Sequence, residues 1–284
     1  MKIALGALIG FVLVAFVGVL IGIRRWQRIT AGFISRLDSA RMRSSQASLL
    51  LEEFDHLPTP VARYLRAALG STRVSVARAH IRWRGRFLVR PDADGWAAFE
   101  ADQVFTTHPP GFVWDARMRM GPGIVTFVRD ALVEDHGFMR GALLGTITVV
   151  DGASTPELDT AALHRYLAEA LWLPTALLPG QGVEWSPLTD TSARASLSAG
   201  GISVTLDFRF GPDGLVESVF TPSRFRDVNG SNVPTPWEGS FTRYENREGL
   251  RVPMEAEVAW LLPDRRLTYW RGTPIEIHYT WARA

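Results

Sequence analysis

The chain has 284 residues, with 31 basic and 29 acidic side chains, six histidines and no cysteine. The absence of cysteine excludes disulfides and thiol chemistry and fits a reducing compartment, although a periplasmic protein can also lack cysteine. Residues 1–43 hold seven basic residues and one acidic residue, so residues 44–284 hold 24 basic and 28 acidic residues. This mildly acidic body argues against nucleic acid as a partner, because phosphate neutralisation dominates nucleic-acid binding.

Residues 3–23 form an unbroken run of apolar residues and glycine, which predicts a transmembrane anchor over residues 1–23. About 20 residues of α-helix cross a hydrocarbon layer roughly 30 Å thick. The alternative is a cleaved signal peptide, which has a shorter apolar core and small residues at its cleavage site. Arg24, Arg25 and Trp26 stand at that place here, so a retained anchor is favoured.

Basic residues predict how the anchor is oriented. Six arginines follow the apolar run closely, whereas only Lys2 and the terminal amine precede it. Basic residues that flank a span favour the cytoplasmic side, so we expect the body to face the cytoplasm. Residues 24–52 are predicted to form a basic juxtamembrane region attracted to anionic lipid and, from about residue 33, a polar helical stalk.

Residues 53–284 contain no low-complexity linker and no repeat of fixed period, so one domain is expected. The first helix is predicted to begin with Thr59 as N-cap and Pro60 in the first turn, and to stop at Gly70. From Val76 the hydrophobic period changes to two, which predicts a half-buried strand. A turn at residues 91–95 then predicts a hairpin with residues 96–105.

The register of this hairpin is predicted from pairs of opposite charges and of large side chains. Such cross-strand pairs each stabilise a sheet by ~0.2–1 kcal/mol. The predicted register pairs Arg90 with Trp96, Arg86 with Glu100, Arg84 with Asp102, Phe87 with Phe99 and Trp83 with Gln103.

The rest of the chain is predicted to form strands interrupted by one helix. The helix begins at a capping box in residues 154–157 and runs to about Leu171, and Pro174 and Pro179 bound an apolar segment that cannot continue it. Alternation predicts strands at residues 112–120, 123–131, 137–150, 202–210, 215–225, 240–246, 252–262, 266–271 and 275–281.

The fold class expected is therefore α+β. A large curved antiparallel sheet, shaped like a half-barrel, carries an N-terminal helix and a helix inserted midway, and a single transmembrane helix precedes it. This order of elements resembles the lipoprotein carriers of the LolA/LolB type, in which helices plug an apolar concavity.

Several longer segments carry a closer resemblance. They are residues 54–61, residues 110–117 (PGFVWDAR), residues 155–159 (TPELD), residues 165–179 (RYLAEALWLPTALLP), residues 235–237 and residues 269–272 (YWRG). Together they resemble an uncharacterised bacterial family, often membrane-anchored, over about residues 53–281. The resemblance implies a bacterial inner-membrane location and no particular activity.

Motifs for catalysis, cofactors and metals are missing from the sequence. It contains no P-loop, HExxH, GxSxG or GxGxxG motif, and none of the six histidines stands at metal-ligand spacing from another. No metal site and no cofactor are therefore predicted, and catalytic residues stay unknown.

Three constellations remain as candidate sites. Asp115 and Arg117, beside Trp114, form either a solvent-side ion pair or the polar lip of a cleft. Glu169 and Trp172 mark either a helix end packed on the sheet or a lid over an apolar pocket. Four arginines on one strand, at positions 78, 82, 84 and 86, form either a solvated face or a surface for anionic lipid. The candidate ligand-binding residues are Trp83, Gln103, Trp114, Asp115, Arg117, Glu169, Trp172, Leu177 and Leu178.

Two function classes follow, and a third is kept behind them. The first is a membrane-anchored protein that binds a lipid or another apolar ligand in the concavity of the sheet. The second is an enzyme that uses Asp, Glu and Arg groups in a reaction that no motif identifies. The third is a structural membrane-associated interaction protein.

Overall fold

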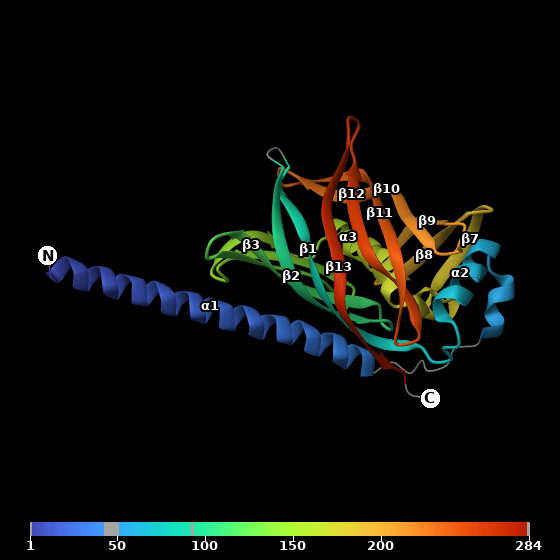
Figure 1. The fold of residues 1–284 in the computed structure, drawn as a ribbon, viewed down its shortest axis with the longest axis horizontal. Coiled ribbons are helices and arrows are strands. Elements are labelled where there is room, and N and C mark those ends of the chain that lie inside the picture. The colour runs from blue at the N-terminus through green and yellow to red at the C-terminus, as the bar shows by residue number, and fades with distance from the viewer. Residues whose placement is uncertain (1, 43–50, 92–93, 283–284) are drawn as a thin grey trace.

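A long helix leads into a 13-stranded antiparallel sheet in the computed structural model, which describes residues 2–42, 51–91 and 94–282 (Figure 1). The helices and 3-10 turns are α1 (Lys2–Met42), η1 (Leu51–His56), α2 (Thr59–Leu69), α3 (Pro156–Glu169), η2 (Ala170–Trp172), η3 (Pro174–Leu177) and η4 (Pro179–Gln181). The strands are β1 (Val76–Arg90), β2 (Gly95–Thr106), β3 (Gly111–Gly121), β4 (Ile124–Val133), β5 (His136–Leu143), β6 (Ile147–Gly152), β7 (Val183–Thr189), β8 (Ser192–Ala199), β9 (Ile202–Phe210), β10 (Val216–Val228), β11 (Ser231–Arg247), β12 (Leu250–Leu261) and β13 (Arg266–Trp281).

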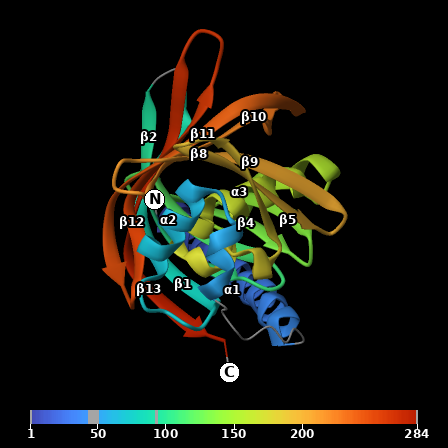
Figure 2. The same cartoon turned by 90° about the vertical axis from the view of Figure 1, so that its right-hand side faces the viewer.

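The sheet consists of two meanders joined in the middle. Strands β1 to β6 form one half and β7 to β13 the other, and the first strand pairs with the last, so that the order is β6-β5-β4-β3-β2-β1-β13-β12-β11-β10-β9-β8-β7. The sheet is curved and unclosed, with β6 and β7 as its edges. Figure 2 looks into the curve and shows α2 and α3 enclosed by the strands. The expected antiparallel half-barrel with a helix inserted midway is confirmed.

The helix α1 lies on the outside of the curve, against β2, β3 and β4. Its N-terminal part projects beyond the body, and the segment Ile9–Met42 is long and apolar enough to cross a membrane. Its C-terminal part packs on the sheet through Trp26, Leu37 and Ala40, which are all buried. Residues 33–42 of this helix therefore lie against the body.

The predicted hairpin forms, but its register differs from the prediction by two residues. Arg84 lies opposite Glu100, and Gly85 lies opposite Phe99. The register shifts between Leu88, which lies opposite Trp96, and Arg90, which lies opposite Gly95 next to the turn. A Cβ at position 85 would collide with the backbone carbonyl oxygen of Arg271 on β13 and would stand 2.6 Å from the Phe99 ring, so both neighbouring strands require a glycine here. A shift of two keeps every side chain on its predicted face.

Other boundaries also differ from the expectations. Pro58 occupies the N-cap position of α2, and Thr59 is already helical, without a side-chain capping bond. Residues 137–150 divide into β5 and β6, whereas residues 266–281 form the one strand β13. Strands β7 and β8 were not predicted, because Ser, Ala, Thr and Pro occupy most of their positions and leave few large apolar side chains to alternate.

Candidate ligand site

The concave side of the sheet is lined with aromatic rings. Trp83 on β1 is 1% exposed and meets Trp172 on η2 edge to face, with ring centroids 4.7 Å apart. Trp270 on β13 contacts Trp83 at 5.6 Å, and Phe99 stacks on Trp270 at 5.9 Å. Trp114 on β3 extends this cluster by an edge contact with Phe99. Each ring stands at an inward position of its strand, as the period of two requires.

The inserted segment covers this aromatic floor. Helix α3 begins at Thr155, whose hydroxyl accepts the backbone N–H of Leu158 at 3.2 Å, and the proline that follows suits the first turn. Beyond Glu169 the chain continues as the 3-10 turns η2, η3 and η4, because two prolines prevent a regular helix. Leu177 and Leu178 lie in this part and are 0% and 4% exposed. We call residues 156–181 the plug.

Side chains of the sheet hold the backbone of the plug. The indole N–H of Trp185 donates to the carbonyl oxygen of Leu177 at 2.9 Å. The hydroxyl of Tyr279 donates to the carbonyl oxygen of Trp172 at 2.7 Å. In the reverse direction, the indole N–H of Trp172 donates to the carbonyl oxygen of Pro253 at 2.7 Å. These bonds satisfy groups that the short turns leave unpaired.

A charged cluster joins the plug to the N-terminal half of the sheet. Arg165 on α3 donates from Nη1 to Asp130 at 2.6 Å and from Nε to Glu169 at 2.8 Å. Gln103 on β2 donates to the other oxygen of Glu169 at 2.7 Å. The guanidinium also lies over the rings of Phe112 and Trp114, at 4.8 and 5.2 Å. The side chains of the ion pairs are only 15–18% exposed.

Burial sets the protonation behaviour of this cluster. Loss of solvent raises the pKa of Glu169, and Arg165 and Gln103 oppose that rise. Burial lowers the pKa of Arg165, but the carboxylates of Glu169 and Asp130 outweigh it, so the pKa of Arg165 is raised. The arginine therefore stays charged in an interior that is otherwise apolar and aromatic.

Seven of the nine candidate residues come together on the concave side, and two do not. The inner set is Trp83, Gln103, Trp114, Glu169, Trp172, Leu177 and Leu178, distributed over β1, β2, β3 and the plug. Asp115 and Arg117 lie on the outer face, because neighbours of Trp114 along a strand point the other way. The inner set is closely packed and mostly buried, so the plug fills the space that it covers.

On the outer face Asp115 fastens α1 to the sheet. The indole N–H of Trp26 donates to Oδ1 of Asp115, and the hydroxyl of Thr30 donates to Oδ2, both at 2.8 Å. Arg129 on β4 donates to the hydroxyl of Thr30 at 2.6 Å and to the carbonyl oxygen of Trp26 at 2.8 Å. Its guanidinium lies 4.1 Å from the centre of the Trp26 ring. We call these four residues the α1 clamp.

Burial dominates the electrostatics of the clamp as well. It raises the pKa of Asp115, against the hydrogen bonds of Trp26 and Thr30, and it lowers the pKa of Arg129. Sequence reasoning missed three of the four clamp residues. A signal existed, because Trp26, Thr30 and Leu37 recur at helical spacing among the basic residues that follow the apolar run.

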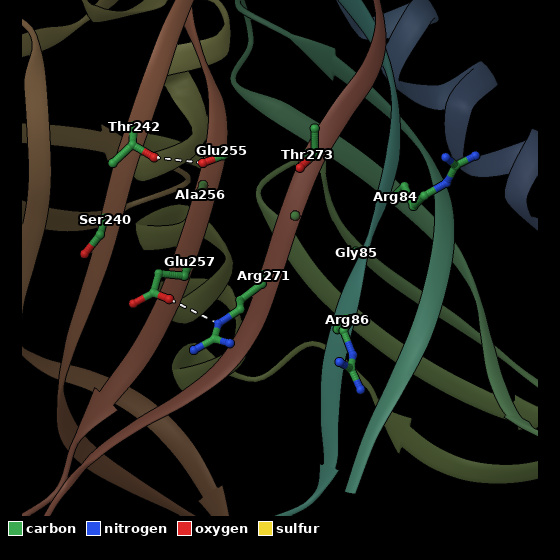
Figure 3. A pocket seen from close by; sticks show the side chains of 11 residues that line it. Arg84, Gly85, Arg86, Ser240, Thr242, Glu255, Ala256, Glu257, Arg271 and Thr273 are labelled. Carbon is green, nitrogen blue, oxygen red and sulfur yellow. Dashed lines mark hydrogen bonds and ion pairs between the residues drawn. The ribbon is translucent and has the colours of Figure 1, made fainter. Parts of the chain in front are cut away.

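Arg117 lines a hollow of about 360 Å³ between α1 and the sheet, together with Val19, Ile23, Glu100 and Phe127 among others. A second hollow, of about 480 Å³, lies on the outer face of β1, β11, β12 and β13 (Figure 3). In that hollow Arg86 stands directly opposite Arg271, which donates to Glu257 at 3.2 Å.

The arginine row of β1 is therefore not uniform. Arg78 pairs with Asp38 on α1 at 3.2 Å, and Arg82 pairs with Glu276 on β13 at 2.6 Å. Within the described part of the chain, Arg84 and Arg86 form no ion pair and no hydrogen bond. Among the same residues, no three His, Asp or Glu side chains are grouped so that they could hold a metal ion.

Residues 48–272 match a family of unknown function, DUF6544, so the chain belongs to that family. No curated protein matches it. Three solved structures are similar at a distance. A LolA superfamily protein from Nitrosomonas europaea is 9% identical with a TM-score of 0.31, and the match covers 80% of this chain and 93% of that one.

The other two solved structures have lower TM-scores. A β-barrel-like protein of the domain of unknown function DUF1849, from Brucella abortus, is 12% identical with a TM-score of 0.25, over 73% of this chain and 99% of that one. The lipoprotein LppX from Mycobacterium tuberculosis is 14% identical with a TM-score of 0.25, over 80% and 97%. At such identities and TM-scores the likeness carries no functional inference.

Proposed function

We propose that this protein is anchored in the bacterial inner membrane by α1 and binds a lipid or another apolar ligand on the concave side of its sheet. In the described conformation the plug occupies that site. The observation that carries the proposal is the charged cluster of Arg165, Asp130, Glu169 and Gln103, which lies at the seam between the plug and an aromatic floor.

If the core stayed permanently closed, this charged cluster would stabilise it less well than apolar side chains in the same place. Charges taken out of water cost several kcal/mol each, and well-packed apolar residues in place of a buried ion pair are often neutral or stabilising. A charged seam is better suited to a contact that opens, because water solvates both sides once they separate. The 3-10 turns after α3 have poorer hydrogen-bond geometry than a helix and so resist such a movement less.

The anchor supports the same function. The exposed apolar part of α1 precedes three arginines, Arg24, Arg25 and Arg28, which favour a cytoplasmic body. A tethered body stays beside a source of lipid. The enzyme alternative is weaker, because the interior carboxylate with a raised pKa, Glu169, has both oxygens engaged by Arg165 and Gln103.

The test uses the full chain, purified from membranes in detergent, with lipid extraction, mass spectrometry and uptake of a fluorescent phospholipid as readouts. The variant Asp130→Leu/Arg165→Met/Glu169→Leu replaces the charged seam with apolar side chains. We expect it to fold with a free energy of unfolding within about 1–3 kcal/mol of that of the wild type, because the apolar replacement is close to neutral and the buried Gln103 loses its acceptor. In this variant, opening of the plug no longer brings charged side chains into water. Opening is therefore less favourable, and the variant should take up much less phospholipid.

The matched control is Arg194→Met/Asp207→Leu, which removes an ion pair of 2.6 Å on the outer face, between β8 and β9. It should leave uptake unchanged. The proposal fails if the wild type yields no lipid and takes up none, or if the apolar triple variant takes up phospholipid as the wild type does.

A further inference from the structure

Two hairpin turns of the body expose apolar side chains beside the N-terminal part of α1. Met120 and Ile124 flank the β3–β4 turn and are 44% and 45% exposed. Ile147 and Val149 follow the β5–β6 turn on the edge strand β6 and are 60% and 55% exposed. Large apolar side chains are rarely gathered in this way on a soluble surface.

These turns touch α1 at the end of its apolar run. A Cβ at Gly22 would collide with Thr146 and would stand 2.8 Å from the carbonyl oxygen of Gly145. Val19 and Ile23 of α1 also line one hollow with Leu144 and Gly123, which belong to the two turns. In Figure 1 the strand ends near the label β3 lie beside α1, close to the part that projects from the body.

The exposed apolar side chains of the helix therefore lie next to those of the turns, and the hollow between them is also lined by Glu100, Arg117 and Arg119. Residues such as Ile21 are exposed on α1, at 61%, immediately before the contact with Gly145. Residues 118–125 and 143–150 contain no acidic side chain, and Arg119 is their only charge. Arg24 and Arg25 follow on α1 one turn later, at the level where lipid phosphates would lie.

We infer that the β3–β4 and β5–β6 turns insert into the membrane interface beside the anchor, so that the body is seated on the bilayer in one orientation. The occupant of this surface is lipid of the leaflet that α1 enters. The inference rests on the proposed anchoring by α1, and it adds a second contact that the anchor alone does not require. The α1 clamp makes the contact rigid, because it fixes the helix to β3 and β4 a few residues further on.

The experiment uses the absence of native cysteine, which makes any introduced cysteine the only label site. The variants Met120→Cys, Ile147→Cys and Val149→Cys are labelled with an environment-sensitive fluorophore. The full chain is reconstituted in vesicles of phosphatidylethanolamine and phosphatidylglycerol. Val12→Cys, in the apolar run, is the positive control, and Leu188→Cys, 43% exposed on the opposite edge strand β7, is the negative control.

We expect the three turn labels to emit at shorter wavelength than the label at Leu188→Cys. Nitroxide-labelled lipid should quench them several-fold more than aqueous iodide does, and the label at Val12→Cys should behave in the same way. Leu188→Cys should show the reverse preference.

Iodide quenching of the turn labels with lipid quenching of Val12→Cys would overturn the inference and leave the anchor intact. Iodide quenching of Val12→Cys would overturn the anchor itself. Protection of Val149→Cys from both quenchers would indicate a second copy on β6 and would also overturn the inference. Circular dichroism of each variant checks that the sheet is retained.

Discussion

Trp26 and Asp115 are 89 positions apart in the sequence, and the indole N–H of Trp26 donates to Oδ1 of Asp115 at 2.8 Å. The bond joins the part of α1 that follows the apolar run to the outer face of the sheet. Trp26 is 4% exposed, so the contact is shielded from water. Movement of the N-terminal part of α1 is thereby transmitted to β3 without a flexible linker between them.

The first prediction concerns this bond. Asp115→Ala removes the acceptor of Trp26 and Thr30 and takes away the carboxylate whose charge favours the charged form of Arg129. Hydrogen bonds to a charged group contribute about 1.5–3 kcal/mol each, so α1 should detach before the sheet unfolds. Hydrogen exchange should accelerate in residues 24–42 and stay slow in β12 and β13. Arg36→Ala, which breaks an exposed ion pair of α1 with Glu134, should accelerate it far less.

The second prediction concerns pH and His164 on α3. Burial lowers the pKa of His164 to about 4, with a smaller contribution from Arg224. The unfolded chain binds a proton at this residue below about pH 6.5, before the folded chain does. The contribution of His164 to stability is therefore complete above that pH and is lost as the pH falls towards 4. The loss should reach about 3 kcal/mol.

Urea unfolding followed by tryptophan fluorescence at several pH values measures this loss. His164→Gln should flatten the dependence between pH 6.5 and 4, and His278→Gln, at an exposed position, should not. An equal slope in the wild type and in His164→Gln would contradict the assignment.

The third prediction tests the hairpin register. In the observed register the imidazole Nε2 of His80 lies 3.1 Å from Oδ1 of Asp102, and this hydrogen bond is the main reason why the pKa of Asp102 is lowered. The register expected from the sequence would move Asp102 to a place opposite Arg84. A double-mutant cycle of Asp102→Ala with His80→Ala should give a coupling of about 0.2–1 kcal/mol. A cycle with Arg84→Ala that couples more strongly would favour the other register.

The fourth prediction concerns the plug. Leu177 is fully buried, so Leu177→Asp places a charge where no partner is available and should unfold the body rather than open a ligand site. Leu177→Ala should cost about 2–5 kcal/mol and keep the fold. Thermal unfolding of both variants gives the comparison. A folded Leu177→Asp variant would show that the plug leaves the sheet easily.

The sequence predicts the sheet well where one face is strongly apolar. In β1 the inward positions of Ala79, Ile81 and Trp83 follow from alternation alone, and all three are buried. The register does not follow, because it depends on Gly85 making room for Phe99 and on the irregularity near the turn. Both are relations between strands, and a pattern within one strand does not contain them.

The candidate site divides in the same way. Alternation correctly places Trp83 and Trp114 on one face. The predicted end of the inserted helix, near Leu171, lies two residues beyond the observed end of α3 at Glu169. The role of Asp115 was not predictable from β3 alone, because its partners Trp26 and Thr30 belong to a helix that covers the outer face. Likewise, Asp130 was missed because its partner Arg165 reaches it across 35 positions.

The pairing of β1 with β13 makes the order of synthesis important. Ile81 pairs on one side with Gln103 of the following strand, β2, but its neighbour on the other side, Ile277, is made only after β12. Until then β1, 15 residues long, is an open edge at the centre of the future sheet, and such an edge is a template for pairing with another chain. Removal of β13 would therefore expose the middle of the sheet instead of trimming its rim. Until β13 has been made, the edge of β1 must therefore be kept from pairing with other chains.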